Sequence, residues 1–289
     1  MKESEIGSVI SFTDFANHYN GFISDYQDSL FPEPAEFMEY LCNCNGKVVV
    51  IGSRPGQGKT SLMLSLIKVY PQLPVLIFSL EMSSTQLIRR FLKVTNETYE
   101  SPLLNQPIEY RVQNYRNMLD TGRNIFICDK SKVSFETFFS IVERQQCEKP
   151  VKVVFIDFYQ LLDDAKPDFL SELKECAELF DVTIVILSQM KREIEEHPLE
   201  TPAIDSFPHL NDPDYIDEAY YLFRPDRYKI IQDDKGNCLE NLVMISGLKG
   251  KFKENRLIFQ INKENGAFSQ AEVLNIMNIP RNFTASYGP

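Results

Sequence analysis

The sequence lacks a long hydrophobic segment. None of its apolar runs approaches the roughly 18 residues that a membrane-spanning helix requires. The N-terminal sequence MKESEIGSVI is acidic and has no apolar stretch of the kind found in secretory signal peptides. Internal repeats and low-complexity segments are also missing. We therefore expect a cytoplasmic protein with no membrane partner.

Cysteine is scarce and is not arranged to bind a metal. The six cysteines are scattered along the chain. Cys42 and Cys44 are too close together for the usual zinc spacing, and no second cysteine pair or histidine pair joins them. The simplest interpretation is a set of free thiols in a reducing compartment.

Positive charge is also in short supply. The chain has 30 lysines and arginines against 41 aspartates and glutamates, which gives a net charge of −11. An acidic surface argues against tight, non-specific binding of nucleic acid by the molecule as a whole. A local basic channel remains compatible with this composition.

What the sequence does contain is an alternation of strand and helix patterns from residue 35 onward. Runs rich in Val, Ile and Phe, separated by amphipathic segments, indicate an α/β domain with a mainly parallel sheet flanked by helices. The last three expected strands have no helices between them, which predicts an antiparallel C-terminal extension. The expected strands are 47–52, 75–80, 124–128, 152–157, 182–187, 218–223, 241–246 and 256–261. The expected helices are 59–70, 83–95, 107–120, 134–146 and 168–180.

Two flanking regions are set apart from this domain, which we place at 31–272. Residues 1–30 are expected to form an N-terminal helical arm, in which Ser11 and Asp14 resemble a capping box. A helix folded back on its own domain is the alternative. Residues 273–289 carry two prolines and a weak pattern, and we interpret them as a tail. The apolar stripe of the arm consists of Phe12, Phe15, Tyr19, Phe22 and Ile23.

Residues 48–66, VVVIGSRPGQGKTSLMLSL, form the central motif of the chain. A buried-strand pattern is followed by a Gly-rich loop ending in Lys59 and Thr60, and then by a helical pattern, which is the context of a phosphate-binding P-loop. Lys59 would reach the β- and γ-phosphates of a nucleotide, and the Thr60 hydroxyl would bind Mg²⁺. The match is not strict, because Ser53 occupies the first glycine position and Gly52 lies one residue early. The alternative is a Gly-rich turn with an incidental lysine.

Polar residues follow three of the other expected strands, where ligands bind in open α/β sheets. Asp157 comes directly after an apolar strand, as does the magnesium-binding aspartate of P-loop ATPases. Glu81 follows the second strand, and Gln189 follows the fifth. Each has an ordinary alternative, since Asp157 could be a loop residue and Glu81 a charge favoured at a helix start. Their order after a P-loop favours a single catalytic site.

These motifs together resemble those of DnaB-type replicative helicases, a branch of the RecA-like ATPases. The resemblance covers about residues 35–270, and the family's N-terminal primase-contacting domain has no counterpart here. The matching segments are GSRPGQGKT at 52–60, SLEMS at 79–83 with QL at 86–87 and Arg90, DFYQL at 157–161, LSQMKR at 187–192 and LFRPDRY at 222–228.

The resemblance implies a RecA-like P-loop NTPase core that binds ATP and Mg²⁺ and hydrolyses ATP. It assigns Glu81 as the general base for water, Gln189 as the γ-phosphate sensor, and Thr60 with Asp157 as the metal site. Lys59 is implied as a catalytic residue at the phosphates. The implied nucleotide-binding residues are Ser53, Arg54, Pro55, Gly56, Gln57, Gly58, Lys59, Thr60, Ser61, Arg90, Arg227 and Tyr228.

The chain departs from the family at three places. The family's Lys-x-Arg finger, which reaches the ATP of a neighbouring subunit, is replaced by SGLKGK at 246–251, where only Lys249 and Lys251 are cationic. Lysine cannot reproduce the bidentate contact of arginine. The two loops expected to face DNA, DDAKPD at 163–168 and REIEEH at 192–197, are acidic. The family's central acidic motif survives mainly as Asp205 and Asp217.

These observations predict a DnaB-like, Mg²⁺-dependent P-loop ATPase that acts on single-stranded DNA in replication or related DNA metabolism. Its expected partners are ATP and ADP, weakly bound single-stranded DNA, and further copies of itself in a ring such as a hexamer. A second hypothesis is a nucleotide-gated binding or assembly module that does not translocate. A third is an inactive structural relative, which the intact Lys59, Glu81 and Asp157 argue against.

Overall fold

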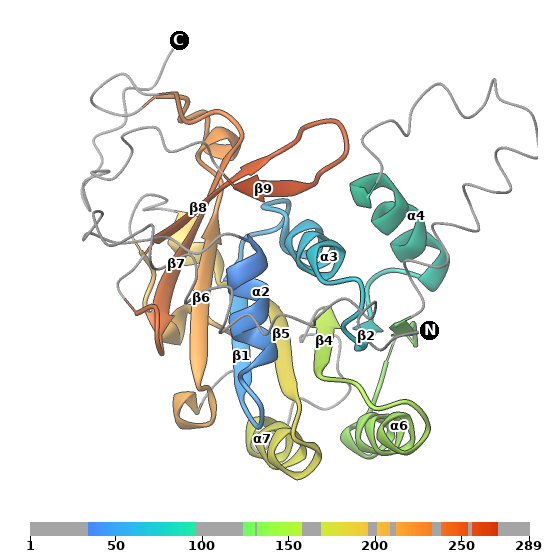
Figure 1. Cartoon of the computed structure of the whole chain (residues 1–289). Coiled ribbons are helices and arrows are strands. Elements are labelled where there is room, and N and C mark those ends of the chain that lie inside the picture. The colour runs from blue at the N-terminus through green and yellow to red at the C-terminus, as the bar shows by residue number, and fades with distance from the viewer. Residues whose placement is uncertain are drawn as a thin grey trace, which may run out of the picture. The chain divides into compact units, whose positions relative to one another are not determined.

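The computed structural model describes residues 34–95, 124–130, 132–157, 169–195, 201–208, 212–232, 238–253 and 256–270. All of them belong to one compact unit, Glu33–Pro289 (Figure 1). The expected arm at 1–30, the expected helix at 107–120 and the expected tail at 273–289 lie outside the described residues.

The described residues contain a nine-stranded sheet with the order β3-β2-β4-β5-β1-β6-β7-β8-β9. Neighbouring strands from β3 to β6 pair in parallel, and β7, β8 and β9 continue the sheet in antiparallel pairing. The strands are β1 (Val48–Ser53), β2 (Val75–Ser79), β3 (Ile125–Cys128), β4 (Val153–Asp157), β5 (Thr183–Gln189), β6 (Glu218–Phe223), β7 (Leu242–Lys249), β8 (Arg256–Ile261) and β9 (Phe268–Gln270).

The predicted mainly parallel sheet with an antiparallel C-terminal extension is confirmed, with one adjustment. β6 pairs in parallel with β1, Val50 lying opposite Ala219, so β6 belongs to the parallel part and the extension begins at β7. β9, which the pattern did not predict, completes the extension through its pairing with β8. β9 is only three residues long, and alternation over three residues is too short to recognise as a strand.

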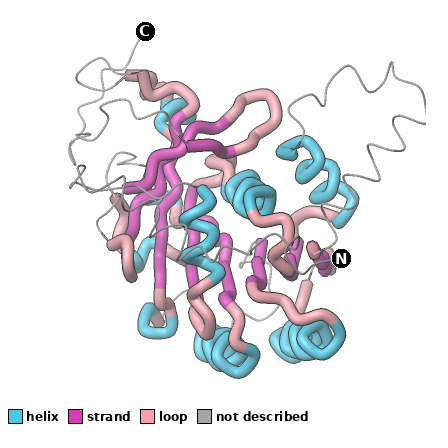
Figure 2. The backbone as a smooth tube through the Cα atoms, in the orientation of Figure 1, coloured by secondary structure: helices cyan, strands magenta, loops and turns pink. Residues whose placement is uncertain are grey.

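Helices cover both faces of the sheet (Figures 1 and 2). They are α2 (Pro34–Cys42), α3 (Lys59–Val69), α4 (Ser84–Thr95), α6 (Phe135–Glu148) and α7 (Phe169–Phe180). Short 3₁₀ turns occupy Arg192–Glu195, Ile204–Ser206, Pro213–Tyr215 and Pro225–Tyr228. The sequence analysis did not identify α2, which begins at Pro34, a residue whose fixed φ suits the first helical position. In the described part of the chain, no helix is both long and apolar enough to cross a membrane.

Alternation along the strands divides the core into two layers. Val48 and Val50 of β1 belong to the hydrophobic cluster that includes residues of α6 and α7, such as Phe138 and Leu173. The opposite face packs against α2 and α3, where the Tyr220 ring meets the Phe37 ring edge-on at 5.1 Å between centroids. Both faces of the sheet are therefore covered near its middle.

Candidate nucleotide-binding site

A cavity of about 410 Å³ lies at the carboxyl edge of the parallel strands. It brings together Lys59, Thr60, Glu81, Asp157 and Gln189, which are supplied by the P-loop helix α3 and by the ends of β2, β4 and β5. These are the residues to which the sequence assigned phosphate, metal and water chemistry. The complete lining consists of Pro55, Gly56, Gly58, Lys59, Thr60, Ser61, Glu81, Arg90, Asp157, Gln189, Arg224, Arg227, Ile261, Asn262, Lys263 and Gly266.

The glycines of the loop serve two different purposes. Gly56 and Gly58 adopt left-handed backbone angles, with φ of +76° and +108°, which a residue with a side chain rarely adopts. Gly52 lies within β1, where a Cβ atom would collide with the ring of Phe207. Gly52 is therefore a packing glycine, whereas Gly56 and Gly58 shape the loop that faces the cavity.

Lys59 is bound to the residue that replaces the motif's first glycine. Its ammonium donates to the hydroxyl of Ser53 at 3.0 Å and to the Ser53 carbonyl oxygen at 3.2 Å. Burial lowers the pKa of Lys59 to about 8, although the nearby Asp157 and Glu81 favour its charged form. Ser53 stands where the motif has glycine, and its hydroxyl therefore gives Lys59 an additional acceptor when no phosphate is bound.

Thr60 and Asp157 form an oxygen pair suited to Mg²⁺. The Thr60 hydroxyl donates to Asp157 Oδ2 at 2.8 Å, and Asp157 is 2% exposed. Burial raises the pKa of Asp157, while the Thr60 hydrogen bond opposes that shift. Mg²⁺ is commonly held by one or two carboxylates together with phosphates and water. This donor set fits that mode, since the described residues contain no group of three or more His, Cys, Asp or Glu that could hold a metal alone.

Glu81 and Gln189 reach the cavity from the ends of β2 and β5, which lie on either side of β4. Glu81 lies in the bend after β2, which is closed by the Ser79 hydroxyl donating to the Met82 carbonyl at 2.7 Å. Gln189 ends β5 directly opposite Ser53 of β1. An exposed carboxylate next to the phosphate loop can accept a proton from water, and a neutral amide can orient water or phosphate by hydrogen bonding.

Two of the predicted nucleotide-binding side chains support the loop instead of lining the cavity. Arg54 is buried and donates through Nη1 to the carbonyl oxygen of Met190 at 2.6 Å. Gln57 is 4% exposed, and its Oε1 accepts the backbone N–H of Arg224 at 2.8 Å. These contacts attach the P-loop to the ends of β5 and β6, so the two side chains fix the shape of the loop.

The other predicted residues differ in their placement. Arg227 lines the cavity, and Arg90 lines it while lying 3.5 Å from the Ser61 hydroxyl. Tyr228 lies outside the lining, with its ring stacked on Phe223 at 5.4 Å between centroids. Contact between Tyr228 and a nucleotide base therefore stays a prediction.

Sequence reasoning missed the second wall of the cavity. Arg224 is 6% exposed and makes a two-point ion pair with Asp226, at 2.7 and 3.1 Å. The turn between β8 and β9, residues 262–267, also lines the cavity and is attached to α3 by the Phe268 N–H donating to Ser65 Oγ at 2.9 Å. Its composition, NKENGA, marks a hairpin turn. No local signal places that turn over the P-loop.

The lysines expected to act as fingers lie away from this cavity. β7 runs antiparallel to β6, so its last residue, Lys249, lies at the amino edge of the parallel strands. The Lys249 ammonium donates to the Pro213 carbonyl at 2.7 Å, and the Lys251 ammonium lies 4.7 Å from the centre of the Tyr40 ring. Neither lysine lines the cavity of its own chain.

Two residues of the family's central acidic motif have structural contacts. Asp217 accepts from the Lys174 ammonium at 2.9 Å and from the Val48 N–H at 2.8 Å, which ties β6 to α7 and β1. The Asp205 carbonyl accepts from the exposed Lys191 at 2.8 Å. The acidic loop at 163–168 and residues 196–197 of the second loop lie outside the described residues.

Comparison with known proteins agrees with this geometry. Residues 43–265 match the family model described as DnaB-like helicase C terminal domain. A replicative DNA helicase DnaB of Helicobacter pylori is 27% identical over 258 residues, covering 79% of this chain and 50% of that protein. A probable plasmid replicative DNA helicase of Chlamydia muridarum is 24% identical over 201 residues, covering 64% of this chain and 43% of that protein. The chain therefore spans about half the length of these curated relatives or less.

Solved structures show the same fold. One solved ATPase domain is 22% identical with a TM-score of 0.69, and the match covers 91% of this chain and 99% of that one. A DnaB-like replicative helicase, solved in a study of its interactions with primase, is 23% identical with a TM-score of 0.70, covering 93% of this chain and 68% of that one. The predicted RecA-like core and the resemblance on which it was based are confirmed. The chain belongs to the family of DnaB-like helicase C-terminal domains.

Proposed function

We propose that this chain is an Mg²⁺-dependent ATPase that works as the motor domain of a replicative helicase on single-stranded DNA. The observation that carries the proposal is the convergence of Lys59, Thr60, Glu81, Asp157 and Gln189 on one cavity from four separate elements. Phosphoryl transfer requires positioning and charge neutralisation more than covalent help from the protein. The residues of this cavity supply those two requirements.

The contacts support the following role for each side chain when ATP binds. The Lys59 ammonium moves from Ser53 to the β- and γ-phosphates, while the loop backbone around Gly56 and Gly58 donates N–H groups to them. Thr60 and Asp157 would hold Mg²⁺, which would supply positive charge to neutralise the phosphates. Glu81 accepts a proton from the attacking water, and Gln189 orients that water against the γ-phosphate.

The arrangement also supports an assembly in which one chain completes the site of the next. Lys249 and Lys251 lie across the sheet from the cavity of their own chain, so their contact with a phosphate requires a second copy. We therefore propose a homo-oligomeric ring. Because lysine is a point charge without the planar fork of arginine, we expect slow hydrolysis even in the assembled protein.

A second candidate is a nucleotide-gated assembly module without translocation. It is favoured by the absence of arginine from residues 246–251 and by the acidic composition of the two loops expected to face DNA. Both features weaken coupling between hydrolysis and DNA, while leaving ATP binding intact.

Steady-state ATP turnover, measured with and without single-stranded DNA, separates these candidates. Stimulation by DNA supports the motor, and turnover that responds to protein concentration but not to DNA supports the assembly module. Glu81→Gln is the negative control, and Glu178→Gln is its matched surface variant, since Glu178 makes an exposed ion pair with Lys174. Wild-type protein that neither binds nor hydrolyses ATP would overturn both candidates.

A further inference from the structure

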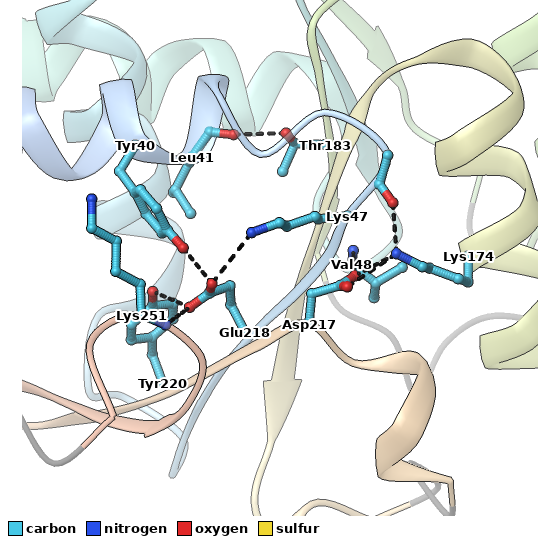
Figure 3. A network of polar contacts seen from close by, with 11 residues as sticks. Tyr40, Leu41, Lys47, Val48, Lys174, Thr183, Asp217, Glu218, Tyr220 and Lys251 are labelled. Carbon is cyan, nitrogen blue, oxygen red and sulfur yellow. Dashed lines mark hydrogen bonds and ion pairs between the residues drawn. The ribbon is translucent and has the colours of Figure 1, made fainter.

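Glu218 is a buried carboxylate that the nucleotide site does not use. It begins β6 on the face covered by α2 and is 2% exposed. Its oxygens accept from the Tyr40 hydroxyl, from the Tyr220 hydroxyl at 3.0 Å and from the Lys251 backbone N–H at 2.9 Å (Figure 3). The ammonium of Lys47 lies 3.7 Å from Oε1. A buried charge is tolerated only when it is fully paired, and here the donors come from four separate segments.

The backbone of residues 247–253 is built around this carboxylate. Gly250 has a φ of +92°, and a Cβ atom on it would collide with the Glu218 carboxylate. A Cβ atom on Gly247 would collide with the carbonyl of Phe252, and Gly247 forms an isolated bridge with Lys253. The turn is therefore closed on itself, and the Glu218 carboxylate occupies the space left by the missing side chain of Gly250.

The two lysine side chains of the turn have defined contacts within the chain. The Lys251 ammonium lies 4.7 Å from the centre of the Tyr40 ring and 5.4 Å from that of Phe252, and these two rings meet edge-on at 5.0 Å. Lys249 is bound to the Pro213 carbonyl at 2.7 Å. Tyr40 thus contacts both the Glu218 carboxylate, which binds the backbone of the turn, and the side chain of Lys251.

The place of Glu218 in the sheet determines which ATP site it can influence. β6 is parallel to β1, and Glu218 pairs with Val49 near the start of β1, whereas the P-loop follows the end of that strand. The network therefore lies at the edge opposite the cavity of its own chain. We propose that Glu218 is a positioning residue for the ATP site of the neighbouring subunit: it fixes the turn that presents Lys249 and Lys251 to that subunit's phosphates. This inference rests on the oligomeric ATPase proposed above.

Mixing experiments test this role in the full-length chain. Glu218→Ala removes the acceptor of the Lys251 N–H, and a displacement of about 1 Å in a group that stabilises the transition state can cost about 10²-fold. We expect turnover of the assembled variant to fall by at least about tenfold. Glu218→Gln keeps a carbonyl acceptor for that N–H and should recover most of the rate. Affinity for a non-hydrolysable ATP analogue should match wild type for both variants.

The decisive readout is complementation. Lys59→Ala has a dead site but an intact turn, so mixed oligomers of Lys59→Ala and Glu218→Ala should hydrolyse more ATP than the sum of the two separate proteins. Affinity-tag capture establishes that mixed oligomers form. Mixed oligomers without gain would overturn the proposal, because the defect would then lie in the subunit's own site. Gly250→Ala keeps Glu218 but places a methyl group against its carboxylate, which displaces the same turn, and this variant replaces Glu218→Ala in the mixture if Glu218→Ala does not fold.

Further controls distinguish a failure of the oligomeric ATPase from a failure of the positioning role of Glu218. Glu178→Gln removes a carboxylate from an exposed ion pair and should leave turnover unchanged. If light scattering shows that the wild-type protein stays monomeric in the presence of Mg²⁺-ATP, the proposed oligomeric ATPase fails. If the wild-type protein assembles and Glu218→Ala hydrolyses ATP as fast as wild type, the positioning role of Glu218 alone is overturned.

Discussion

Asp157 and Glu218 are two buried carboxylates at opposite edges of one sheet. Each is 2% exposed. Asp157 is the last residue of β4 and Glu218 is the first residue of β6, and both strands belong to the parallel part of the sheet. Asp157 lines the cavity and accepts from the Thr60 hydroxyl, in a position where Mg²⁺ and phosphate can approach. Glu218 is surrounded by the Tyr40 and Tyr220 hydroxyls and a backbone N–H, and it does not line that cavity.

The difference shows that a buried carboxylate can have either a ligand-binding role or a structural role. Burial raises the pKa of Asp157, so the folded protein holds this carboxylate at an energetic disadvantage that a metal ion can relieve. Glu218 already has its donors within the chain, so its charge stabilises the turn at 247–253 and nothing else needs to bind. A buried carboxylate therefore marks a ligand site when an open cavity adjoins it, and an internal support when protein donors fill its surroundings.

The largest expected effect concerns the cavity edge. Glu81→Gln removes the proposed proton acceptor, and a general base contributes about 10²–10⁴-fold to a rate. ATP turnover should fall by that factor while affinity for a non-hydrolysable analogue stays close to wild type. Single-turnover kinetics with radiolabelled ATP measure the chemical step. Unchanged hydrolysis would assign the base to another residue and leave Glu81 as a helix-start charge.

The comparison itself is tested by paired stability measurements. Asp157→Asn removes a carboxylate that is unfavourable in the unliganded fold, so its unliganded stability should be no lower than wild type, while stabilisation by Mg²⁺-ATP should be lost. Glu218→Ala leaves buried donors without an acceptor, which lowers stability by about 1–3 kcal/mol. Stabilisation by Mg²⁺-ATP should remain in that variant. Denaturant titrations with and without Mg²⁺-ATP report both quantities, and identical behaviour of the two variants would invalidate the distinction.

A smaller effect follows from the depressed pKa of Lys59. In the unliganded fold this pKa is about 8, below its ordinary value of 10.5, and bound phosphates favour the charged ammonium. Binding of ATP above pH 8 should therefore take up a proton, and affinity should fall by up to about tenfold per pH unit. Stability of the unliganded protein should instead rise from pH 8 to 10.5, because the unfolded chain then binds the extra proton.

Calorimetric titration at about pH 9, between the two pKa values, in two buffers of different ionisation enthalpy measures that proton uptake. Lys263→Ala removes an exposed cavity-lining lysine that is not held by the P-loop, and proton uptake should persist in this control. Absence of proton uptake in the wild-type protein would show that Lys59 keeps its proton throughout this range.

The smallest expected effect concerns DNA. Lys191 and Arg192 follow β5, and the loop that they begin continues with acidic residues. Each neutralised phosphate of a single strand contributes about −0.7 to the slope of log K against log salt, so about three contacts give a slope near −2. Titration of labelled single-stranded DNA at several salt concentrations measures it. Lys191→Ala should make the slope shallower by about 0.7, and tight binding with a steep slope would favour the full motor.

Local chemistry made much of the molecule predictable. The bounds of every strand from β1 to β8 were predicted to within a few residues, because short runs rich in Val, Ile and Phe usually form buried strands in an α/β chain. Gln189 and Asp157 could be assigned because each ends such a run. α2 was missed because it has only nine residues, and its first residue, Pro34, belongs to a residue type that more often interrupts a helix. The sequence motif does not account for Gly52, whereas the bulk of Phe207 does.

The sequence by itself determined the strand–loop–helix of residues 48–66, the carboxylate after β4 and the family, because these depend on residues close together along the chain. The tertiary structure alone decided that the turn at 262–267 and Arg224 complete the cavity, and that Tyr40 lies on the same carboxylate as Lys251. The hydrogen bond between Tyr40 and Glu218 joins residues 178 apart, and the one between Phe268 and Ser65 joins residues 203 apart. They follow from the insertion of β1 between β5 and β6, and no local pattern of side chains encodes the order of strands in a sheet.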